Sequence, residues 1–417
     1  FASQTVTKHR HRKVDFANEV MVITKMRNIQ LLNKIAKCGT DVFDESYAVS
    51  ETCENPDAIM VRSAVMHDME FGSNLKAIAR AGAGVNNIPL DKCAEEGIVV
   101  FNTPGANANG VKELAICGML LACRDVVGGI NWVQTVKDDP NVAKLIEKEK
   151  SKFAGTEIKG KTLGIIGLGA IGGPLATAAT HLGMEVLGCD PYISVEAAWE
   201  ISRSVRKVDT REEIFKNADI ISVHTPLIDN PDPKIGTKYM INKDTIAMMK
   251  DGVIILNFAR DALVNDDDLE AALKSGKVRR YVTDFPNART AGMEGVIAIP
   301  HLGASTEESE DNCAIMAAKE LREYLENGNI THSVNFPDVS MPHNGDGRIC
   351  VLHRNIPNLL TQITAAVSAE NINIENMANR SKKDYAYTIV EITGSIPDSI
   401  VEAIKKIDGV IRVNVIK

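Results

Sequence analysis

Two side chains have the chemistry to move a proton and to hold an anion beside it. Arg260 follows an apolar, strand-like run at 253–257, and His301 follows a second such run at 296–299. An arginine is permanently charged and can hold a carboxylate through two parallel hydrogen bonds. A histidine exchanges a proton near neutral pH. With a nicotinamide beside them, such groups can oxidise a hydroxyl next to a carboxylate.

His301 has competitors, because a lone histidine is more often structural than catalytic. His224 also ends a strand-like run and is the strongest of them. Its neighbours Thr225 and Pro226 form a turn that would pass under a bound dinucleotide, so we assign all three residues to shaping the cofactor cleft. The other positions are less suited to catalysis: His9 and His11 near the start of the chain, His67 in a polar stretch and His181 inside an expected helix.

A glycine-rich turn predicts where that dinucleotide binds. Gly167, Gly169 and Gly172 form G-x-G-x-x-G, with Ala170 and Ile171 between the last two, after an apolar strand and before a helical pattern. Such a turn lets the backbone and the free N–H groups of a helix approach a pyrophosphate. Asp190 ends the next expected strand, where a carboxylate binds ribose hydroxyls and favours NAD over NADP. The alternatives are a packing turn without a ligand and a strand-end surface aspartate.

The elements that must position these residues alternate between strands and helices. Alternation of this kind predicts an α/β fold with open, doubly wound parallel sheets. One long helix is expected at about 111–133, and a capping box from Ser305 to Glu308 would open another that ends near residue 326. The expected strands are at 28–32, 58–61, 77–80, 98–101, 162–166, 185–190, 219–224, 253–257, 280–284 and 296–299.

Residues 333–346 are rich in Pro, Asn, Asp and Gly and are interpreted as a linker. From Arg348 onward the pattern runs strand, helix, strand, strand, helix, strand. That order predicts a ferredoxin-like module of about seventy residues. A module of this size is small for independent stability, so pairing with a second copy is expected.

Composition excludes several classes of function. The chain has 417 residues with 44% hydrophobic and 24% charged residues, which predicts a globular protein of two or three domains. A formal net charge of −8 provides no basic field for nucleic acid. No apolar run has the length of a membrane span, and the eight cysteines show no metal-binding spacing. We therefore expect no metal, no membrane partner and a cytoplasmic location, and we leave the polar, basic residues 1–25 out of the fold.

Together the motifs resemble the D-2-hydroxyacid dehydrogenases over residues 26–417, most closely the branch that acts on 3-phosphoglycerate and carries a C-terminal ACT domain. The resemblance rests on the glycine turn, the segments 224–227, 257–260 and 300–303, and the final module. It implies an NAD-binding Rossmann domain at 112–300, inserted in a discontinuous substrate domain at 26–111 and 301–332. The linker at 333–346 and an ACT domain at 347–417 would follow. A homodimer or homotetramer is implied as well.

Residue roles follow from the same resemblance. Arg260 would hold the substrate carboxylate, and His301 would take the C2 hydroxyl proton while hydride leaves for the nicotinamide. Arg62 would contact the phosphate of the substrate. The further substrate contacts implied are Ser63, Ala83, Gly84, Val85 and Asn107, and the further cofactor contacts are Phe258, Ala259, Asp284 and Gly303.

One departure from the family concerns the catalytic histidine. The family usually has a glutamate hydrogen-bonded to it, and the matching position here is Ala288. The imidazolium of His301 should then be less stabilised, unless another carboxylate substitutes. Glu294 is near in sequence but not at the motif position. Asp261 stands where many members have glycine, which would alter the loop after Arg260.

The C-terminal module resembles ACT domains in which L-serine binds between two copies. His353, Asn355 and Asn373 stand at effector-side positions. Asn358, however, stands where ligand-binding ACT loops often have glycine for close backbone approach. A serine effector site and a purely structural dimerisation module therefore both stay open.

The leading functional prediction is NAD-dependent oxidation of D-3-phosphoglycerate to 3-phosphohydroxypyruvate, the first step of L-serine biosynthesis. It depends on Arg62 and the C-terminal module. A reductase for hydroxypyruvate, glyoxylate or another small 2-keto acid shares the chemistry but needs no phosphate contact. A catalytically weak NAD-sensing protein on the same fold is the third alternative, favoured by the missing glutamate.

Overall fold

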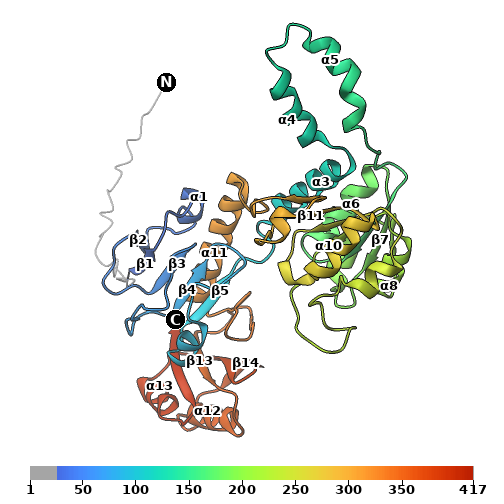
Figure 1. The fold of residues 1–417 in the computed structure, drawn as a ribbon. Coiled ribbons are helices and arrows are strands. Elements are labelled where there is room, and N and C mark those ends of the chain that lie inside the picture. Colours follow the sequence, from blue (N-terminus) through green and yellow to red (C-terminus); the bar gives the residue numbers. More distant parts are fainter. Residues whose placement is uncertain (1–25, 417) are drawn as a thin grey trace, which may run out of the picture.

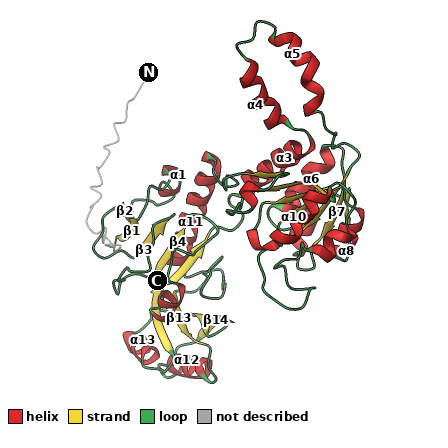
Figure 2. Cartoon of the chain, viewed as in Figure 1, coloured by secondary structure: helices red, strands yellow, loops and turns green. Residues whose placement is uncertain are grey.

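The computed structural model describes residues 26–416, which form three sheets (Figure 1). Helices lie around all three sheets (Figure 2). The polar, basic residues 1–25, which the sequence analysis left out of the fold, lie outside the described residues. Within residues 26–416, no helix combines the length and the apolar character that crossing a membrane requires.

The first sheet has five parallel strands in the order β2-β1-β3-β4-β5. This doubly wound order changes direction between β1 and β3, and ligands bind beyond the carboxyl ends of strands at such a point. The strands are β1 (Arg27–Leu31), β2 (Tyr47–Ser50), β3 (Ala58–Val61), β4 (Ala77–Arg80) and β5 (Val99–Asn102), with helices α1 (Lys37–Thr40) and α2 (Leu90–Glu95) in the connections.

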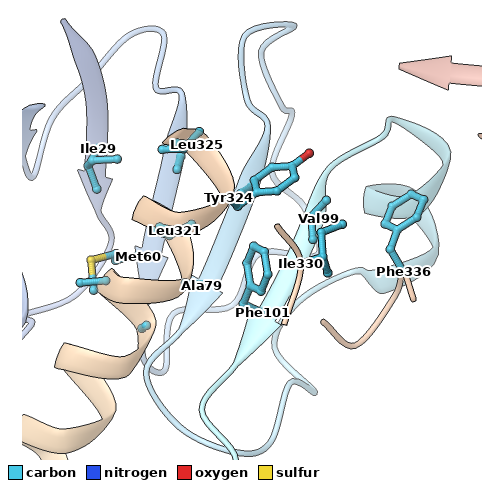
Figure 3. Packing of buried hydrophobic residues seen from close by; sticks show 14 of the residues in the cluster. Ile29, Met60, Ala79, Val99, Phe101, Leu321, Tyr324, Leu325, Ile330 and Phe336 are labelled. Atoms are coloured by element: carbon cyan, nitrogen blue, oxygen red, sulfur yellow. The ribbon is translucent and has the colours of Figure 1, made fainter. Parts of the chain in front are cut away.

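Helix α11 (Glu307–Asn327) returns from far along the chain to cover this sheet (Figure 3). Its apolar side chains pack on the strands, with the rings of Tyr324 and Phe101 5.8 Å apart. The helix begins one residue later than the predicted capping box, because the side chain of Thr306, not Ser305, accepts from the Ser309 N–H. It ends at Asn327, and the C-cap residue Gly328 has a φ of 70°, which suits glycine.

The second sheet has seven parallel strands in the order β12-β11-β10-β9-β6-β7-β8. Its direction changes between β6 and β9, which places a dinucleotide crevice beyond those two strands. The expected strands of this sheet agree with the observed ones to within two residues. The strands are β6 (Thr162–Ile166), β7 (Glu185–Cys189), β8 (Val205–Lys207), β9 (Ile220–Val223), β10 (Val253–Asn257), β11 (Val278–Thr283) and β12 (Val296–Ala298).

Helices cover both faces of the second sheet, with short 3₁₀ turns between some of them (Figure 2). These elements are α3 (Ala108–Cys123), α6 (Gly172–His181), α7 (Val195–Glu200), α8 (Arg211–Asn217), α9 (Lys243–Met248), α10 (Asp266–Ser275), η2 (Asp261–Leu263) and η3 (Thr290–Gly292).

The prediction of one long helix at about 111–133 is wrong, because two helices occupy this stretch. Helix α3 ends at Cys123, Arg124 is extended, and α4 (Val126–Val136) begins after Asp125, whose carboxylate accepts from the Gly128 N–H at 3.0 Å. This aspartate N-cap starts a new helix without interrupting the apolar spacing. Helix α4 forms a hairpin with α5 (Val142–Glu149), which η1 (Lys150–Phe153) follows, and the hairpin projects away from the sheets (Figure 1).

The C-terminal sheet has four antiparallel strands in the order β14-β15-β13-β16. Its first and third strands in sequence lie in the centre, and two helices lie in the connections. The predicted βαββαβ order is therefore confirmed. The elements are β13 (Gly347–Arg354), α12 (Leu359–Ser368), β14 (Ile374–Lys382), β15 (Tyr385–Ile392), α13 (Asp398–Lys405) and β16 (Val410–Ile416).

The C-terminal module is firmly docked on the first sheet. Within 333–346, which contains no helix or strand, Phe336 is buried in the same core as Phe101. A buried ion pair joins Arg348 and Glu391 at 2.6 Å. Arg348 also donates to the Asn329 side chain and to the backbone carbonyl of Asn327, the last residue of α11. Removing one partner of such a buried pair is strongly destabilising. The hydrogen bonds from Arg348 to Asn327 and Asn329 join the module to the end of α11.

The buried Glu320 of α11 provides a test of stability. It is 5% exposed, one oxygen lies 2.8 Å from His332 Nδ1, and burial raises its pKa from 4.5 to about 9. The folded state keeps this proton where the unfolded chain releases it. The free energy of unfolding should therefore fall as pH rises from about 4.5 to about 9.

Replacing Glu320 with Gln should remove this dependence. The unchanged protein should lose stability with rising pH, and the variant should not. The thermal midpoint of Glu320→Gln minus that of the unchanged protein should therefore increase between about pH 6 and about pH 8.5. Glu307→Gln, in the exposed first turn of α11, is the matched control and should give a constant difference. A constant difference for Glu320→Gln would contradict the buried, protonated state.

Candidate active site

One cleft of about 950 Å³ is lined by residues that follow strands of both parallel sheets. From the first sheet, these residues come after β1, β3, β4 and β5. From the second sheet, they come after β6 and after β9 to β12. Both points at which strand order changes direction therefore face the same cleft, as expected for ligand binding in open α/β sheets.

Three side chains that line the cleft follow three neighbouring strands. Arg260 comes after β10, Asp284 after β11 and His301 after β12. The ring of Phe285 lies between two of them, 4.4 Å from the His301 ring and 5.6 Å from the Arg260 guanidinium carbon. The structure thus brings together the two residues that the sequence selected for proton transfer and carboxylate binding.

Hydrogen bonds fix the backbone on either side of these residues. The Asn257 side chain donates to the Arg260 carbonyl at 2.9 Å and accepts from the Ala259 N–H at 3.2 Å. His301 has a φ of 46°, a left-handed conformation that few non-glycine residues adopt, although asparagine, aspartate and histidine adopt it more often than the others. Strained backbone of this kind concentrates at functional sites.

Asp284 is the buried carboxylate of the cleft, with 2% of its surface exposed. Burial raises its pKa, whereas His301, the Gly303 N–H and Arg260 act in the opposite direction. Its Oδ1 has no hydrogen-bond partner within residues 26–416. A carboxylate oxygen in this state has the capacity to accept one more hydrogen bond.

The glycine turn has the shape that a pyrophosphate needs. A Cβ at Gly167, whose φ is 93°, would lie 2.5 Å from the His224 carbonyl, and one at Gly172 would lie 1.9 Å from the Gly167 carbonyl. A Cβ at Gly169 would meet nothing within 4 Å. The first and third glycines are therefore required by packing, and the second leaves open space. Helix α6 has no side-chain cap, so its N-terminus fits a phosphate.

Asp190 connects this turn to the end of β7. Its Oδ2 accepts from the Leu168 N–H at 2.8 Å, and its Oδ1 accepts from the Tyr192 N–H at 2.9 Å. Each oxygen keeps a further lone pair for a ribose hydroxyl. Five predicted site residues do not line the cleft itself: Gly167, Gly169, Gly172, Asp190 and Val85.

His224 is unsuited to acid–base work near neutral pH. Its Nε2 lies 2.8 Å from Ser222 Oγ, and burial lowers its pKa to about 4. The ring is therefore neutral at pH 7. Together with Thr225 and Pro226 it lines the cleft beside Phe258 and Ala259, as expected for residues that shape a cofactor site.

The first-sheet side of the cleft is basic. Lys34, Arg62 and Arg80 line it, and Arg80 Nε donates to the Arg62 carbonyl at 3.1 Å. The Asn33 side chain accepts from three consecutive N–H groups, starting at Arg62. The remaining predicted substrate contacts that line the cleft are Ser63, Ala83, Gly84 and Asn107.

The sequence analysis did not select Lys34, Arg80 or Glu310. Arg80 ends β4 as Arg62 follows β3, so a basic residue at a strand end was the available signal. Glu310 lies on α11 and pairs with Arg62 at 2.6 Å, with both side chains nearly half exposed. Because that contact joins residues 248 positions apart, no local pattern indicated it.

Ala288 is exposed and does not line the cleft. The neighbouring Asn287 side chain donates to Asp261 and Asp266, which holds the loop after β11 against η2 and α10. This contact explains what the unusual Asp261 does: it accepts from Asn287 at 3.2 Å.

The three predicted effector residues have partners within the C-terminal module. His353 is buried, with Nδ1 2.8 Å from the Arg354 carbonyl and Nε2 2.8 Å from Thr388 Oγ1. The amides of Asn355 and Asn373 donate to the Lys383 carbonyl and to Glu375. Asn358 has a φ of 67°, the conformation that glycine adopts most readily.

Comparison with known sequences gives one family model and several relatives of the same enzyme class. Residues 116–303 match the model of the D-isomer specific 2-hydroxyacid dehydrogenase NAD-binding domain. The chain is 30% identical to D-3-phosphoglycerate dehydrogenase of Haemophilus influenzae over 84% of this chain and 83% of the relative. It is 39% identical to hydroxypyruvate reductase of Thermotoga maritima over 62% and 81%. With D-3-phosphoglycerate dehydrogenase of Methanocaldococcus jannaschii it shares 36% identity over 69% of this chain, spanning 53% of that relative.

Solved structures show the same architecture. The NAD⁺-bound 3-phosphoglycerate dehydrogenase of Entamoeba histolytica superposes with a TM-score of 0.55 at 27% identity, over 74% of this chain and 98% of that one. The D-mandelate dehydrogenase of Rhodotorula graminis gives a TM-score of 0.62 at 24% identity, over 76% and 100%, which supports the fold alone.

Proposed function

Since the chain belongs to the D-isomer specific 2-hydroxyacid dehydrogenases and uses NAD, we propose that its reaction is the oxidation of D-3-phosphoglycerate to 3-phosphohydroxypyruvate, the first step of L-serine biosynthesis. The observation that supports this substrate is a cleft to which both parallel sheets contribute cations. Arg260 lies on one side, and Lys34, Arg62 and Arg80 lie on the other. A substrate with a carboxylate and a phosphate fits two separate cationic sites.

The proposed reaction uses few groups. Arg260 binds the carboxylate and polarises the C2 oxygen, and His301 takes the proton of the C2 hydroxyl. Bound NAD supplies the acceptor for the hydride that leaves C2. Asp190 and the glycine turn at Gly167 hold the cofactor, and the neutral His224 ring shapes its cleft. In the reverse direction, the protonated His301 returns the proton to the carbonyl oxygen.

A reductase for hydroxypyruvate or a related unphosphorylated acid is the second candidate. The observation that favours it is the Arg62–Glu310 pair, because a carboxylate already occupies the cation that would bind phosphate. The hydroxypyruvate reductase relative supports it as well. A phosphate, with more charge than a carboxylate, would have to displace Glu310 from Arg62.

Substitution at Arg62 separates the two candidates. Arg62→Ala should raise KM for D-3-phosphoglycerate about 10- to 150-fold, because loss of a hydrogen bond to a charged group costs about 1.5–3 kcal/mol. The same change should leave KM for hydroxypyruvate nearly unchanged. Glu310→Gln is the matched variant and should lower KM for the phosphorylated acid. An equal effect of Arg62→Ala on both substrates would contradict phosphate binding there.

The domain organisation and assembly form part of the proposal. Residues 26–111 with 301–332 bind the substrate, 112–300 bind NAD, and 347–417 are an ACT domain. The helices α4 and α5 of the projecting hairpin contain no buried residue. Three large apolar side chains of α4, Val126, Val127 and Ile130, are exposed. A second copy covering this face would form the homodimer, or half of a homotetramer. Binding of L-serine to the ACT domain would require the His353 side chain to give up an internal partner.

A further inference from the structure

We infer that Phe285 positions His301 and Arg260 relative to each other, through contacts of its ring with both side chains. The inference rests on the proposed roles of these two residues, His301 as acid and base and Arg260 as the group that binds the carboxylate. The sequence analysis did not select Phe285, and the proposed reaction gives it no part.

The ring of Phe285 contacts both side chains. Its centroid lies 4.4 Å from that of the His301 imidazole, with 44° between the two planes. The guanidinium carbon of Arg260 lies over the same ring, 5.6 Å from its centroid. Tilted rings attract each other at about the first separation, and a cation is attracted to a ring within about 6 Å of the centroid. One side chain therefore joins the acid–base group to the carboxylate-binding group.

The backbone on both sides of Phe285 is fixed. Its N–H donates to Thr283 Oγ1 at 3.0 Å, and Thr283 is buried at the end of β11. Two residues beyond Phe285, the Asn287 side chain donates to Asp261 at 3.2 Å. The sheet order β12-β11-β10 places this segment between the loops that carry the other two side chains. The ring is thus a fixed surface on which those side chains can rest.

His301 and Arg260 need such a surface because both are exposed where they line the cleft. In a 2-hydroxy acid, the carboxylate is bonded to the carbon that carries the hydroxyl. The two groups that act on these neighbouring positions must therefore keep one separation and one orientation. A misplacement of about 1 Å in such a site can cost about 10²-fold in rate. Ala288, which is exposed and does not line the cleft, gives the imidazole no support.

The ring also suits the charges that the reaction requires. To reduce a keto acid, His301 must carry a proton beside the permanently charged Arg260, and two cations repel each other. The face of an aromatic ring is electronegative and attracts a cation. A neutral ring shared by both groups offsets part of the repulsion without a negative charge that would repel the substrate carboxylate. Phe285 thus acts through the other two residues, as a positioning residue.

The main alternative is that Phe285 only lines the cleft and contacts the keto acid or the nicotinamide. The two roles have different kinetic signatures. A contact with either ligand acts on KM for that ligand. A residue that positions the acid–base group acts on kcat, and its effect depends on the presence of that group.

The test is Phe285→Leu, which keeps apolar bulk but removes the ring, in the reduction of hydroxypyruvate by NADH. We expect kcat to fall about 5- to 70-fold, the loss of one aromatic contact and one exposed cation–π contact. KM for NADH should change less than about threefold. Phe285→Tyr keeps the ring and should keep kcat within about twofold. Phe43→Leu removes a ring that stacks on Tyr47 outside the cleft, and this matched control should leave kcat unchanged.

A double-mutant cycle with His301→Gln separates positioning from packing. The loss caused by Phe285→Leu should be at least about twofold smaller in the His301→Gln background, where no imidazole remains to be positioned. An equal loss in both backgrounds, an equal loss in Phe285→Tyr, or an unchanged kcat would overturn the inference and leave the proposed function standing. A His301→Gln enzyme that keeps its activity would overturn both. Should Phe285→Leu not fold, Phe285→Met also keeps apolar bulk without a ring and should show the same loss.

Discussion

Replacing His301 with Gln is expected to lower kcat by about 10²- to 10⁴-fold, the usual contribution of a positioned acid or base. The imidazole lines the cleft beyond β12, and no other histidine that lines it can take over its role. His224 also lines the cleft, but its pKa of about 4 keeps it neutral. NADH binding, measured by fluorescence, should be unchanged, because the glycine turn and Asp190 are untouched.

His181→Gln is the matched control for this experiment. His181 is exposed in the last turn of α6 and does not line the cleft, so kcat should change less than about twofold. A His301→Gln enzyme that keeps activity within a few-fold of the unchanged protein would exclude His301 as the acid and base.

Replacing Arg260 with Ala is expected to lower kcat/KM by about 30- to 4,000-fold, since removal of one partner from a desolvated ion pair costs about 2–5 kcal/mol. Arg260→Lys should lose about 10- to 100-fold, because an ammonium keeps the charge but not the two parallel hydrogen bonds. Steady-state kinetics with a 2-keto acid and NADH measures both effects.

Arg289→Ala controls for loss of an arginine elsewhere. Its guanidinium pairs with Asp267 and Glu270 outside the cleft, so kcat/KM should stay within about twofold. If Arg260→Lys and Arg260→Ala lose the same factor in kcat/KM, the positive charge by itself contributes nothing to carboxylate binding. Retention of kcat/KM in Arg260→Ala would exclude Arg260 from carboxylate binding.

Much of the fold was predictable because its signals are local. Apolar runs such as β3 and β10 are fully buried, and a buried parallel strand reads as a continuous apolar segment. The G-x-G-x-x-G motif has a steric requirement at Gly167 and Gly172 that only glycine meets. The strand, helix and strand-end order then placed Arg260 and His301 in one cleft.

The errors occurred where a single side chain overrides periodicity. The break between α3 and α4 depends on the cap from Asp125 to Gly128, which the apolar pattern does not show. The start of α11 depends on which of two adjacent hydroxyl residues accepts the capping bond. In both cases one capping hydrogen bond decides where a helix begins, and the apolar spacing does not show that bond.

The residues that the sequence missed are those that tertiary contacts define. Glu310 meets Arg62 only because α11 returns to the first sheet. Asp284 was selected from the sequence, but its place between Arg260 and His301 depends on the order β12-β11-β10. Similarly, Glu320 is buried beside His332, and Arg348 is buried where it bonds Asn327 and Asn329, contacts that the local sequence pattern does not indicate.

The most direct test of the whole account follows the hydride. D-3-phosphoglycerate that carries deuterium at C2 should reduce NAD in the presence of the enzyme, with a trap for the keto acid. The account predicts that the label appears in the reduced nicotinamide and that the L-isomer gives no reaction. Absence of label from the reduced cofactor, or no reduction with the D-isomer, would contradict it.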